Sequence, residues 1–316
     1  MDNRAIMFRW QGCAICLATL LTAAVAEAQP AIGATVSSDA RYAGDQGFLV
    51  KASAAGGGKV QVDLQSLGPG LKAKGAPLKL YRGDRVLTTL ALRQDAVLVP
   101  LINGGRQPFV RFAVLARGPG GEIIGSPRML DATASRQGTD SVPTAVIACS
   151  DPQGFTVLWQ EQVIQAGRAD ARTYLARIAP DGRWLEPAKV VQVPWAIGAI
   201  AHSGTGYHLA IFYDGARPDQ TRLCFVTLSA GGRPQQHPWW GTEQGLIDEV
   251  QLMPIPGGVQ AYYRGGPKGR SLRSVQVTSI GRWGHEPRPS QDHGAIATSA
   301  DFALRLGSGR QVVVVR

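Results

Sequence analysis

Short apolar runs separated by Gly, Pro, Ser and Asp recur at a fixed spacing in the C-terminal half of this chain. Runs that begin at Gly154, Gly206 and Gly258 are each 52 residues apart, and one more step reaches Arg310 near the chain end. The segments just upstream also align: AVIACSDPQG, IGAIAHSGTG, EVQLMPIPGG and DFALRLGSGR. Each reads as a strand, a turn and a second strand, which predicts a repeated β-hairpin.

A second hairpin follows the first in three of these units. Its first strand lies in RTYLARIAPDGRW, RLCFVTLSAGGRP and SLRSVQVTSIGRW, and each copy carries Gly-Arg after the strand. The three pairs are Gly182-Arg183, Gly232-Arg233 and Gly281-Arg282. Glycine suits a turn position that requires a positive φ. Four short strands in about 52 residues predict one blade of a β-propeller.

Over residues 143–316 the sequence therefore resembles β-propeller proteins of the Asp-box or kelch-like kind. An Asp-box has the pattern Ser-x-Asp-x-Gly-x-Thr-Trp. The segments 179–184 (APDGRW) and 278–283 (TSIGRW) are distant echoes of it, since both lack the Thr and the second also lacks the Asp. The resemblance implies blades stacked around an axis and does not point to one family.

The N-terminal part has its own pattern of strand-like runs from Gly47 onward. Residues 46–130 resemble an immunoglobulin-like or fibronectin type III-like β-sandwich, carried by Leu80-Tyr81-Arg82-Gly83-Asp84 and by Phe112 to Arg117 before a Gly-rich turn. About 85 residues is a suitable length for such a domain. Residues 29–45 read as a flexible lead-in and 131–142 as a linker. The predicted fold is all-β, a sandwich followed by propeller-like repeats.

A competing interpretation concerns residues 111–127. This segment also resembles the second hairpin of the repeat, and the fourth repeat ends at Arg316 with only its first hairpin. Residues 111–127 could therefore complete a single four-bladed propeller. The sandwich is preferred because residues 77–115 read together as a sandwich sequence.

The first 28 residues have the three parts of a cleavable secretory signal peptide. Arg4 and Arg9 precede an apolar run from Ala14 to Ala26, and Ala26-Glu27-Ala28 is a small-x-small cleavage site. The apolar run is shorter than the roughly 20 residues that a transmembrane helix needs. We therefore expect a periplasmic or secreted protein, with no membrane-spanning segment after cleavage.

The net charge of the protein narrows the class of its binding partner. The formal net charge is +10, and the basic residues are spread through the repeats. For an exported protein, a protein or glycan partner of the cell envelope is more natural than nucleic acid, and much of the charge serves solubility.

Two cysteines, Cys149 and Cys224, remain after signal cleavage. They could pair in an oxidising compartment. Both lie in apolar strand-like runs, where a free cysteine commonly acts as a small core residue, so pairing is left open.

Motifs for catalysis are absent from the sequence. It contains no nucleophile elbow, phosphate loop, HExxH or dinucleotide fingerprint, and its five histidines lack metal-ligand spacing, so no metal or cofactor is expected. A glycosidase would need two carboxylates about 5 to 10 Å apart. The candidates in or beside the repeats are Glu161, Asp214, Glu243, Asp248, Glu249, Glu286 and Asp292.

Aromatic residues suggest binding instead. Trp239-Trp240 lie in the loop-like stretch HPWWGTEQG, where an exposed indole pair could stack on a sugar ring or anchor a partner. The alternative is that both fill the seam between blades. The repeated arginines Arg183, Arg233 and Arg282 complete the candidate binding residues.

Degenerate repeats without a polar constellation favour an exported, non-catalytic binding or scaffold protein that recognises a glycan or a protein. The alternative is a glycan-acting hydrolase built on a propeller, since propellers host both kinds of function.

Overall fold

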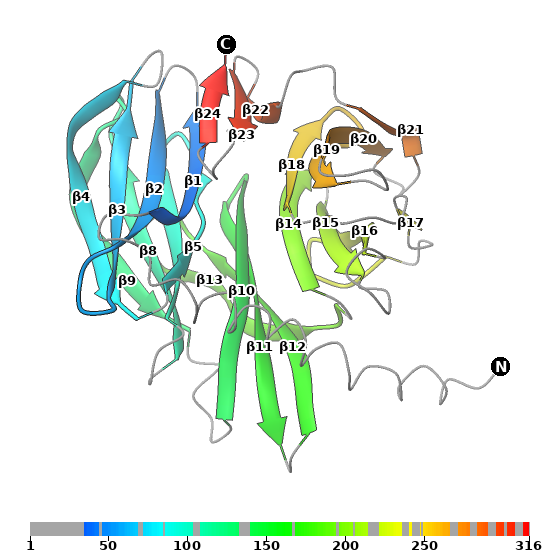
Figure 1. The fold of residues 1–316 in the computed structure, drawn as a ribbon, viewed down its shortest axis with the longest axis horizontal. Helices are drawn as coiled ribbons and strands as arrows, with labels where there is room; N and C mark the ends of the chain where they lie inside the picture. Colours follow the sequence, from blue (N-terminus) through cyan, green and yellow to red (C-terminus); the bar gives the residue numbers. More distant parts are fainter. Residues whose placement is uncertain are drawn as a thin grey trace.

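The computed structural model describes most of the chain after residue 34. The described residues are 35–43, 46–68, 72–84, 86–103, 108–132, 140–165, 168–193, 196–204, 206–213, 221–235, 240–241, 247, 249–265, 271–278, 283–289, 295–299, 302–306 and 312–315. Within these residues the strands form six antiparallel sheets, each made of strands that follow one another along the chain (Figure 1). The expected signal segment 1–28 lies outside them, and no helix in the described part is long and apolar enough to cross a membrane.

The first three sheets hold the strands β1 to β13. The first contains β1 (Thr35–Ala43), β2 (Gln46–Ala54), β3 (Val60–Leu67) and β4 (Ala73–Gly83). The second contains β5 (Val86–Thr88), β6 (Ala91–Leu92), β7 (Ala96–Asn103), β8 (Phe109–Arg117) and β9 (Ile123–Asp131). The third contains β10 (Asp140–Asp151), β11 (Gly154–Gln165), β12 (Arg168–Ile178) and β13 (Trp184–Val191).

The last three sheets hold β14 to β24. The fourth contains β14 (Ala196–Ser203), β15 (Gly206–Tyr213), β16 (Arg222–Ser229) and β17 (Trp240–Gly241). The fifth contains β18 (Glu249–Ile255), β19 (Gly258–Gly265), β20 (Ser271–Thr278) and β21 (Trp283–Pro289). The sixth contains β22 (Ala295–Ser299), β23 (Phe302–Leu306) and β24 (Val312–Val315).

The first strands of successive sheets lie side by side. β10 contacts β14, β14 contacts β18, and β18 contacts β22, while on its other side β10 contacts β6 and β7. The first described strand approaches the last sheet, because β1 contacts β22 and β24 (Figure 1). No strand pairing joins the first and last sheets among the described residues. The architecture is therefore all-β and propeller-like, without closure by hydrogen-bonded strands.

The 52-residue repeat is confirmed in the third to fifth sheets. Gly154, Gly206 and Gly258 each begin the second strand of a sheet, directly after the first hairpin turn. One more step of 52 reaches Arg310, just before β24, which is the third strand of its sheet and not the second.

The turn before the outermost strand repeats with the same geometry. In the third sheet Ala179 N donates to Arg183 O and Gly182 N to Ala179 O; Ser229, Arg233 and Gly232 make the same pair of bonds in the fourth sheet. Gly182 and Gly232 both have a φ of 77°, which confirms the expected positive-φ glycine.

The second sheet contains this turn as well. Gly118 N donates to Glu122 O, Gly121 N donates to Gly118 O, and Gly121 has a φ of 77°. Residues 111–127 thus do resemble the second hairpin of the repeat. They pair with β7 in their own sheet, however, so the alternative in which they complete the last blade of a four-bladed ring is wrong.

Alternation of side chains explains how the sheets stack. All eight residues of β7 are buried, because one set of its side chains packs on the first sheet and the other on the third. Val97, Val99 and Leu101 join the core shared with β2 and β3. Leu98 and Ile102 join the core shared with β11 and β12.

The expected immunoglobulin-like sandwich over residues 46–130 is not shown by this arrangement. A sandwich encloses one core between two sheets with Greek-key connections. Here both sheets in this region have consecutive strand order, and the second sheet is covered on both faces. Residues 35–43, which the sequence placed in a flexible lead-in, form β1, and the linker region overlaps the start of β10 at Asp140. The domain boundaries themselves stay predictions.

The glycine at the outer turn also packs against the preceding sheet. A Cβ placed on Gly232 would lie 3.0 Å from Leu175 Cδ1 and 3.3 Å from Val191 Cγ1, whereas Gly257, with the same φ of 77°, has no atom within 4 Å of such a Cβ. The positive φ alone costs an alanine about 1–2 kcal/mol. We expect Gly232→Ala to lower the free energy of unfolding by more than Gly257→Ala does, because it adds crowding to that strain. Urea denaturation of both variants measures the difference, and equal losses would show that the turn does not pack on the third sheet.

Candidate functional site

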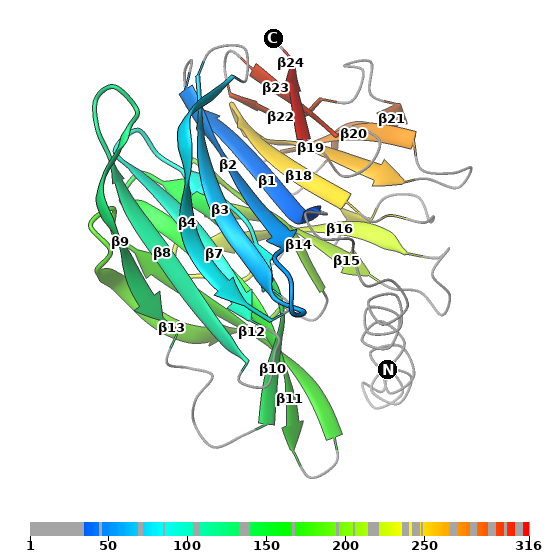
Figure 2. The ribbon, with the colours of Figure 1, turned by 60° about the vertical axis from the view of Figure 1, so that its left-hand side comes forward.

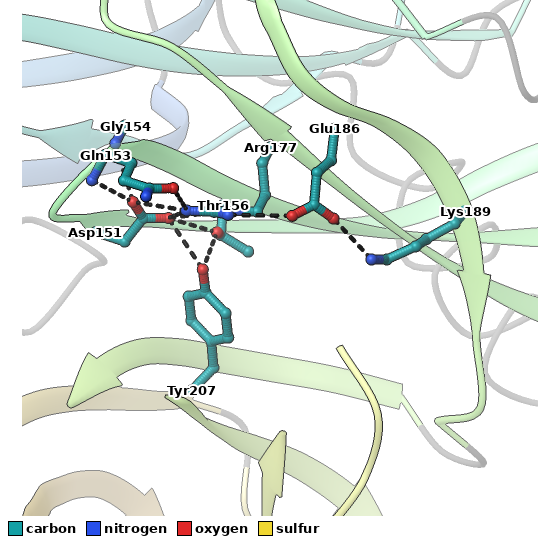
Figure 3. Close-up of polar contacts among 8 residues, drawn as sticks. All are labelled: Asp151, Gln153, Gly154, Thr156, Arg177, Glu186, Lys189 and Tyr207. Atoms are coloured by element: carbon teal, nitrogen blue, oxygen red, sulfur yellow. Dashed lines mark hydrogen bonds and ion pairs between the residues drawn. The ribbon is translucent and has the colours of Figure 1, made fainter. Parts of the chain in front are cut away.

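A connected set of polar side chains surrounds Asp151, at the turn between β10 and β11 (Figure 3). Asp151 Oδ1 accepts hydrogen bonds from the backbone N–H groups of Gln153 (2.8 Å) and Gly154 (2.9 Å). Thr156 Oγ1 and Tyr207 Oη lie 2.9 Å and 3.0 Å from Oδ2. The backbone bonds are those of an Asx-type turn, so this carboxylate fixes the hairpin that its own sequence, Asp-Pro-Gln-Gly, initiates.

Arg177 extends this network along β12. Its Nη2 lies 3.3 Å from Asp151 Oδ1, and its Nη1 lies 3.1 Å from Glu186 Oε1. Lys189 Nζ in turn lies 2.7 Å from Glu186 Oε2. Burial acts to raise the pKa of Asp151, but the N–H of Gln153, the Thr156 hydroxyl and Arg177 outweigh it and lower the pKa below its usual value.

The Asp151 cluster links three consecutive sheets. Tyr207 belongs to the fourth sheet, and Arg93, in the second sheet, donates to the backbone carbonyl of Asp151. Burial raises the pKa of Tyr207, so its hydroxyl stays protonated and able to donate at neutral pH. The oxygens of Asp151 are saturated with donors and the residue is 5% exposed. This arrangement suits a structural connection between sheets rather than a nucleophile or a base.

A different kind of carboxyl group lies near the far end of β11. Glu161 is 1% exposed. Trp159 Nε1 donates to its Oε1 at 2.9 Å, and the Ser141 side chain makes a second hydrogen bond to the carboxyl group. Glu161 Oε2 is buried with no hydrogen-bond partner among the described residues. A buried polar oxygen without a partner is rare in native proteins and calls for an explanation.

The electrostatics of Glu161 favour its protonated form. Burial raises its pKa above the ordinary carboxyl value, although the hydrogen bonds from Trp159 and Ser141 and the charge of Arg172 act in the opposite direction. Arg172 lies directly across from Glu161 on β12 and is part-exposed. The group is thus held as a carboxylic acid over a wider pH range than a solvated glutamate.

An aromatic cluster packs beside this carboxyl group. Trp159 stacks on Tyr174 with ring centroids 5.3 Å apart and meets Phe112 edge-on at 5.7 Å. Trp184 covers Phe112 from the other side at 5.8 Å. An apolar wall next to a carboxyl group is the environment that keeps the acid neutral at higher pH.

The binding residues expected from the sequence are not gathered at one place. Arg183 and Arg233 are both exposed on equivalent outer turns, but in different sheets, and Arg183 pairs with Asp181 at 2.6 Å. The backbone of Trp240 lies in β17 opposite Phe225, while Trp239 and Arg282 fall outside the described residues.

The two cysteines are not bonded to each other. Cys149 and Cys224 are free thiols that pack in the same apolar cluster between the third and fourth sheets. Burial raises the pKa of both thiols, that of Cys224 to about 11, which keeps them in the unreactive form. Among the described residues no group of three or more His, Cys, Asp or Glu side chains could hold a metal ion.

Sequence reasoning named Glu161 among its carboxylates but missed Asp151 and Arg177. The 52-residue repeat places Ser203 and Ile255 at positions equivalent to Asp151, and Tyr213 and Gly265 at positions equivalent to Glu161. A polar residue that departs from its repeat equivalents was the available signal. It could not show which of the two carboxylates is satisfied, because that depends on partners from neighbouring sheets.

Comparisons with known proteins give no family for the chain. No family model matches it, and no curated protein does. Among solved structures it is similar to the GH43_1 enzyme from Xanthomonas citri, with 13% identity, a TM-score of 0.48, and coverage of 87% of this chain and 98% of that one. It is also similar to a GH43 β-xylosidase/α-arabinofuranosidase from a compost microbial metagenome, with 11% identity, a TM-score of 0.48, and coverage of 80% and 94%.

A third similar structure is the catalytic domain of the GH62 α-L-arabinofuranosidase of Coprinopsis cinerea, with 12% identity, a TM-score of 0.43, and coverage of 76% and 86%. These neighbours are enzymes that act on glycans, so the preference for a non-catalytic binding or scaffold protein is corrected in favour of the hydrolase alternative. At this degree of overlap none of them assigns a role to a residue of this chain.

The Asp151 cluster predicts a large loss of stability on removal of the carboxylate. Asp151→Ala leaves Arg177 and the hydroxyls of Thr156 and Tyr207 buried without their shared acceptor. Breaking a buried ion pair in this way costs about 3–5 kcal/mol. Asp181→Ala is the control, since Asp181 pairs with Arg183 on an outer turn where both side chains are more than half exposed and an ion pair contributes little. Urea denaturation at pH 7 should separate the two variants clearly, and similar midpoints would contradict the role given to Asp151.

His208 predicts how stability changes in acid. It is 2% exposed, and burial lowers its pKa to about 4. The unfolded chain takes up a proton near pH 6.5 while the folded protein does not. His208 therefore destabilises the wild type progressively as pH falls from about 6.5 to about 4, by about 3 kcal/mol in total.

The variant His208→Leu removes this proton uptake. We expect the free energy of unfolding of His208→Leu minus that of the wild type to be about 3 kcal/mol larger at pH 4 than at pH 7. Urea denaturation at both pH values measures this difference. The control His202→Asn changes a half-buried histidine and should retain most of the wild-type slope. A His208→Leu slope equal to that of the wild type would count against a neutral His208.

Proposed function

We propose that this protein is an exported, glycan-acting hydrolase in which Glu161 is the general acid. The observation that carries the proposal is the state of its carboxyl group, which is buried, raised in pKa and left with one oxygen free of hydrogen-bond partners among the described residues. Glycoside hydrolysis requires one carboxylic acid that remains protonated near neutral pH and donates its proton to the leaving oxygen.

The local geometry supports this role over a purely structural one. Trp159 and Ser141 both hydrogen-bond to the carboxyl group and so fix its orientation, as a positioned acid requires. Of the seven carboxylates picked out from the sequence, Glu161 is the one whose side chain the structure describes. A charge buried only for stability would find its partners within the fold, as Asp151 does.

The substrate class is a glycan whose bond is broken by proton donation to the glycosidic oxygen. Pentosides are the first substrates to test, because xylosidases and arabinofuranosidases are named among the similar structures. The export signal and a periplasmic or secreted location belong to the same proposal, since polymeric glycans are encountered outside the cytoplasm.

Glu161→Gln tests the proposal by removing the proton while keeping the shape. We expect the mature wild type to hydrolyse aryl α-arabinofuranosides or β-xylosides, and Glu161→Gln to lower kcat by at least about 100-fold, the usual contribution of a general acid. The wild-type rate should fall as pH rises through the raised pKa of Glu161, because the ionised form cannot donate.

Thermal unfolding distinguishes the loss of a general acid in Glu161→Gln from a structural defect. Ionisation of a buried carboxyl costs stability as pH rises, so Glu161→Gln should keep or raise Tm at pH 8. Asp170→Asn removes an exposed charge from the neighbouring strand and should leave rate and pH profile unchanged. An inactive wild type, or an unaltered pH profile in Glu161→Gln, would overturn the proposal.

A further inference from the structure

Lysine is concentrated in the first sheet rather than spread along the chain. Five of the seven lysines lie between residues 51 and 79. The even spread of basic residues expected from the sequence is therefore wrong for lysine. The five are Lys51, Lys59, Lys72, Lys74 and Lys79.

Four of these side chains are exposed and unpaired. Lys51 lies on β2, Lys74 and Lys79 lie on the outermost strand β4, and Lys72 immediately precedes that strand. None of the four forms an ion pair with a described residue, while the fifth, Lys59, pairs with Asp84 at 2.7 Å. We call these four residues the lysine strip.

The alternation of β2 and β3 explains why Lys51 and Lys79 face solvent. Val50, Val62 and Leu64 point into the core shared with the second sheet. Lys51 and Asp63 therefore point to the opposite face. On β3, Asp63 is paired with Lys51 of β2 on one side and with Lys79 of β4 on the other. Asp63 accepts a hydrogen bond from Gln61 and offsets one of the four positive charges.

This face and the β4 edge are the least covered parts of the first sheet. In the described residues the main contacts of the sixth sheet with the first are made through β1, at the other side of the sheet (Figure 2). Seven of the ten residues Ala73–Arg82 are exposed, and no described strand lies beyond β4. An open edge lined with lysine resists pairing with other strands and remains available to a soluble partner.

We infer that the lysine strip binds an anionic polysaccharide, one that carries carboxylate or sulfate groups along its chain. Lys74 and Lys79 lie five positions apart along β4, up to about 16 Å, which suits a linear polyanion better than a small anion. This surface is separate from the proposed hydrolytic site at Glu161, and the inference goes beyond that function.

The side-chain types favour a glycan over a nucleic acid. Proteins that bind single strands combine cations with aromatic platforms on which bases stack. The one aromatic residue of β4, Tyr81, packs edge-on against Phe109 with centroids 5.6 Å apart. The nearby Arg82 is engaged with the carbonyl of Ala55 at 3.0 Å. The strip therefore offers point charges without stacking surfaces.

The test measures binding of the mature protein to polygalacturonate at low ionic strength by isothermal titration calorimetry. Lys74→Glu/Lys79→Glu should raise Kd at least tenfold, and wild-type binding should weaken steeply between 50 and 300 mM salt, as expected for exposed charges. The charge-matched control is Arg128→Glu/Arg222→Glu, which reverses two exposed arginines in the second and fourth sheets. It should retain most of the wild-type affinity.

Two outcomes would overturn the inference. Equal weakening in both double variants would mean that net charge, rather than the lysine strip, governs binding. Equally tight binding of a DNA oligonucleotide that depends on the same two lysines would point to nucleic acid. Hydrolysis of aryl pentosides should be unchanged in Lys74→Glu/Lys79→Glu, so failure of this inference and failure of the proposed function are distinguishable.

Discussion

The stacking of sheets that are apolar on both faces is the constraint on which the rest of this structure depends. β7 shows it most clearly, since its alternate residues enter two different cores. The same division continues in the third and fourth sheets, where Leu158 and Leu175 face one neighbour while Trp159 and Tyr174 face the other. Because each interface is buried, a polar group inside the stack must bring its own partners or remain at a cost in free energy.

Asp151 and Glu161 show the two ways in which this chain meets that constraint. Asp151 is surrounded by donors from its own turn, from β12 and from the fourth sheet, so its charge joins neighbouring sheets. Glu161 Oε2 has no hydrogen-bond partner among the described residues, and burial raises the pKa of the group and favours the neutral acid. The hydrogen bonds of Asp151 are complete without any ligand, whereas Glu161 Oε2 keeps a hydrogen-bonding capacity that a substrate can use.

Local patterns predicted much of the architecture. The strand–turn–strand units, the 52-residue period and the glycine at the outer turn all follow from chain-local rules, and Gly182 and Gly232 adopt the expected φ. The sandwich expectation failed because alternation alone does not reveal whether a second face is covered. The uniformly apolar run Ala96–Ile102 was the signal for a sheet buried on both sides, and Pro100 within it obscured the pattern. The identity of the satisfied carboxylate was not predictable, since Tyr207 lies 56 residues from Asp151.

The repeat itself gives the strongest reason to separate function from scaffold in this chain. Positions equivalent to Glu161 hold Tyr213 and Gly265, the last residues of the second strands β15 and β19, and both sheets form without a carboxyl group there. The blade therefore has no need of a carboxyl group at this point. A residue that the architecture does not require, and that burial makes costly, is retained for a reason outside folding. The fold does not require the lysine strip either, because its exposed side chains form no ion pair with a described residue.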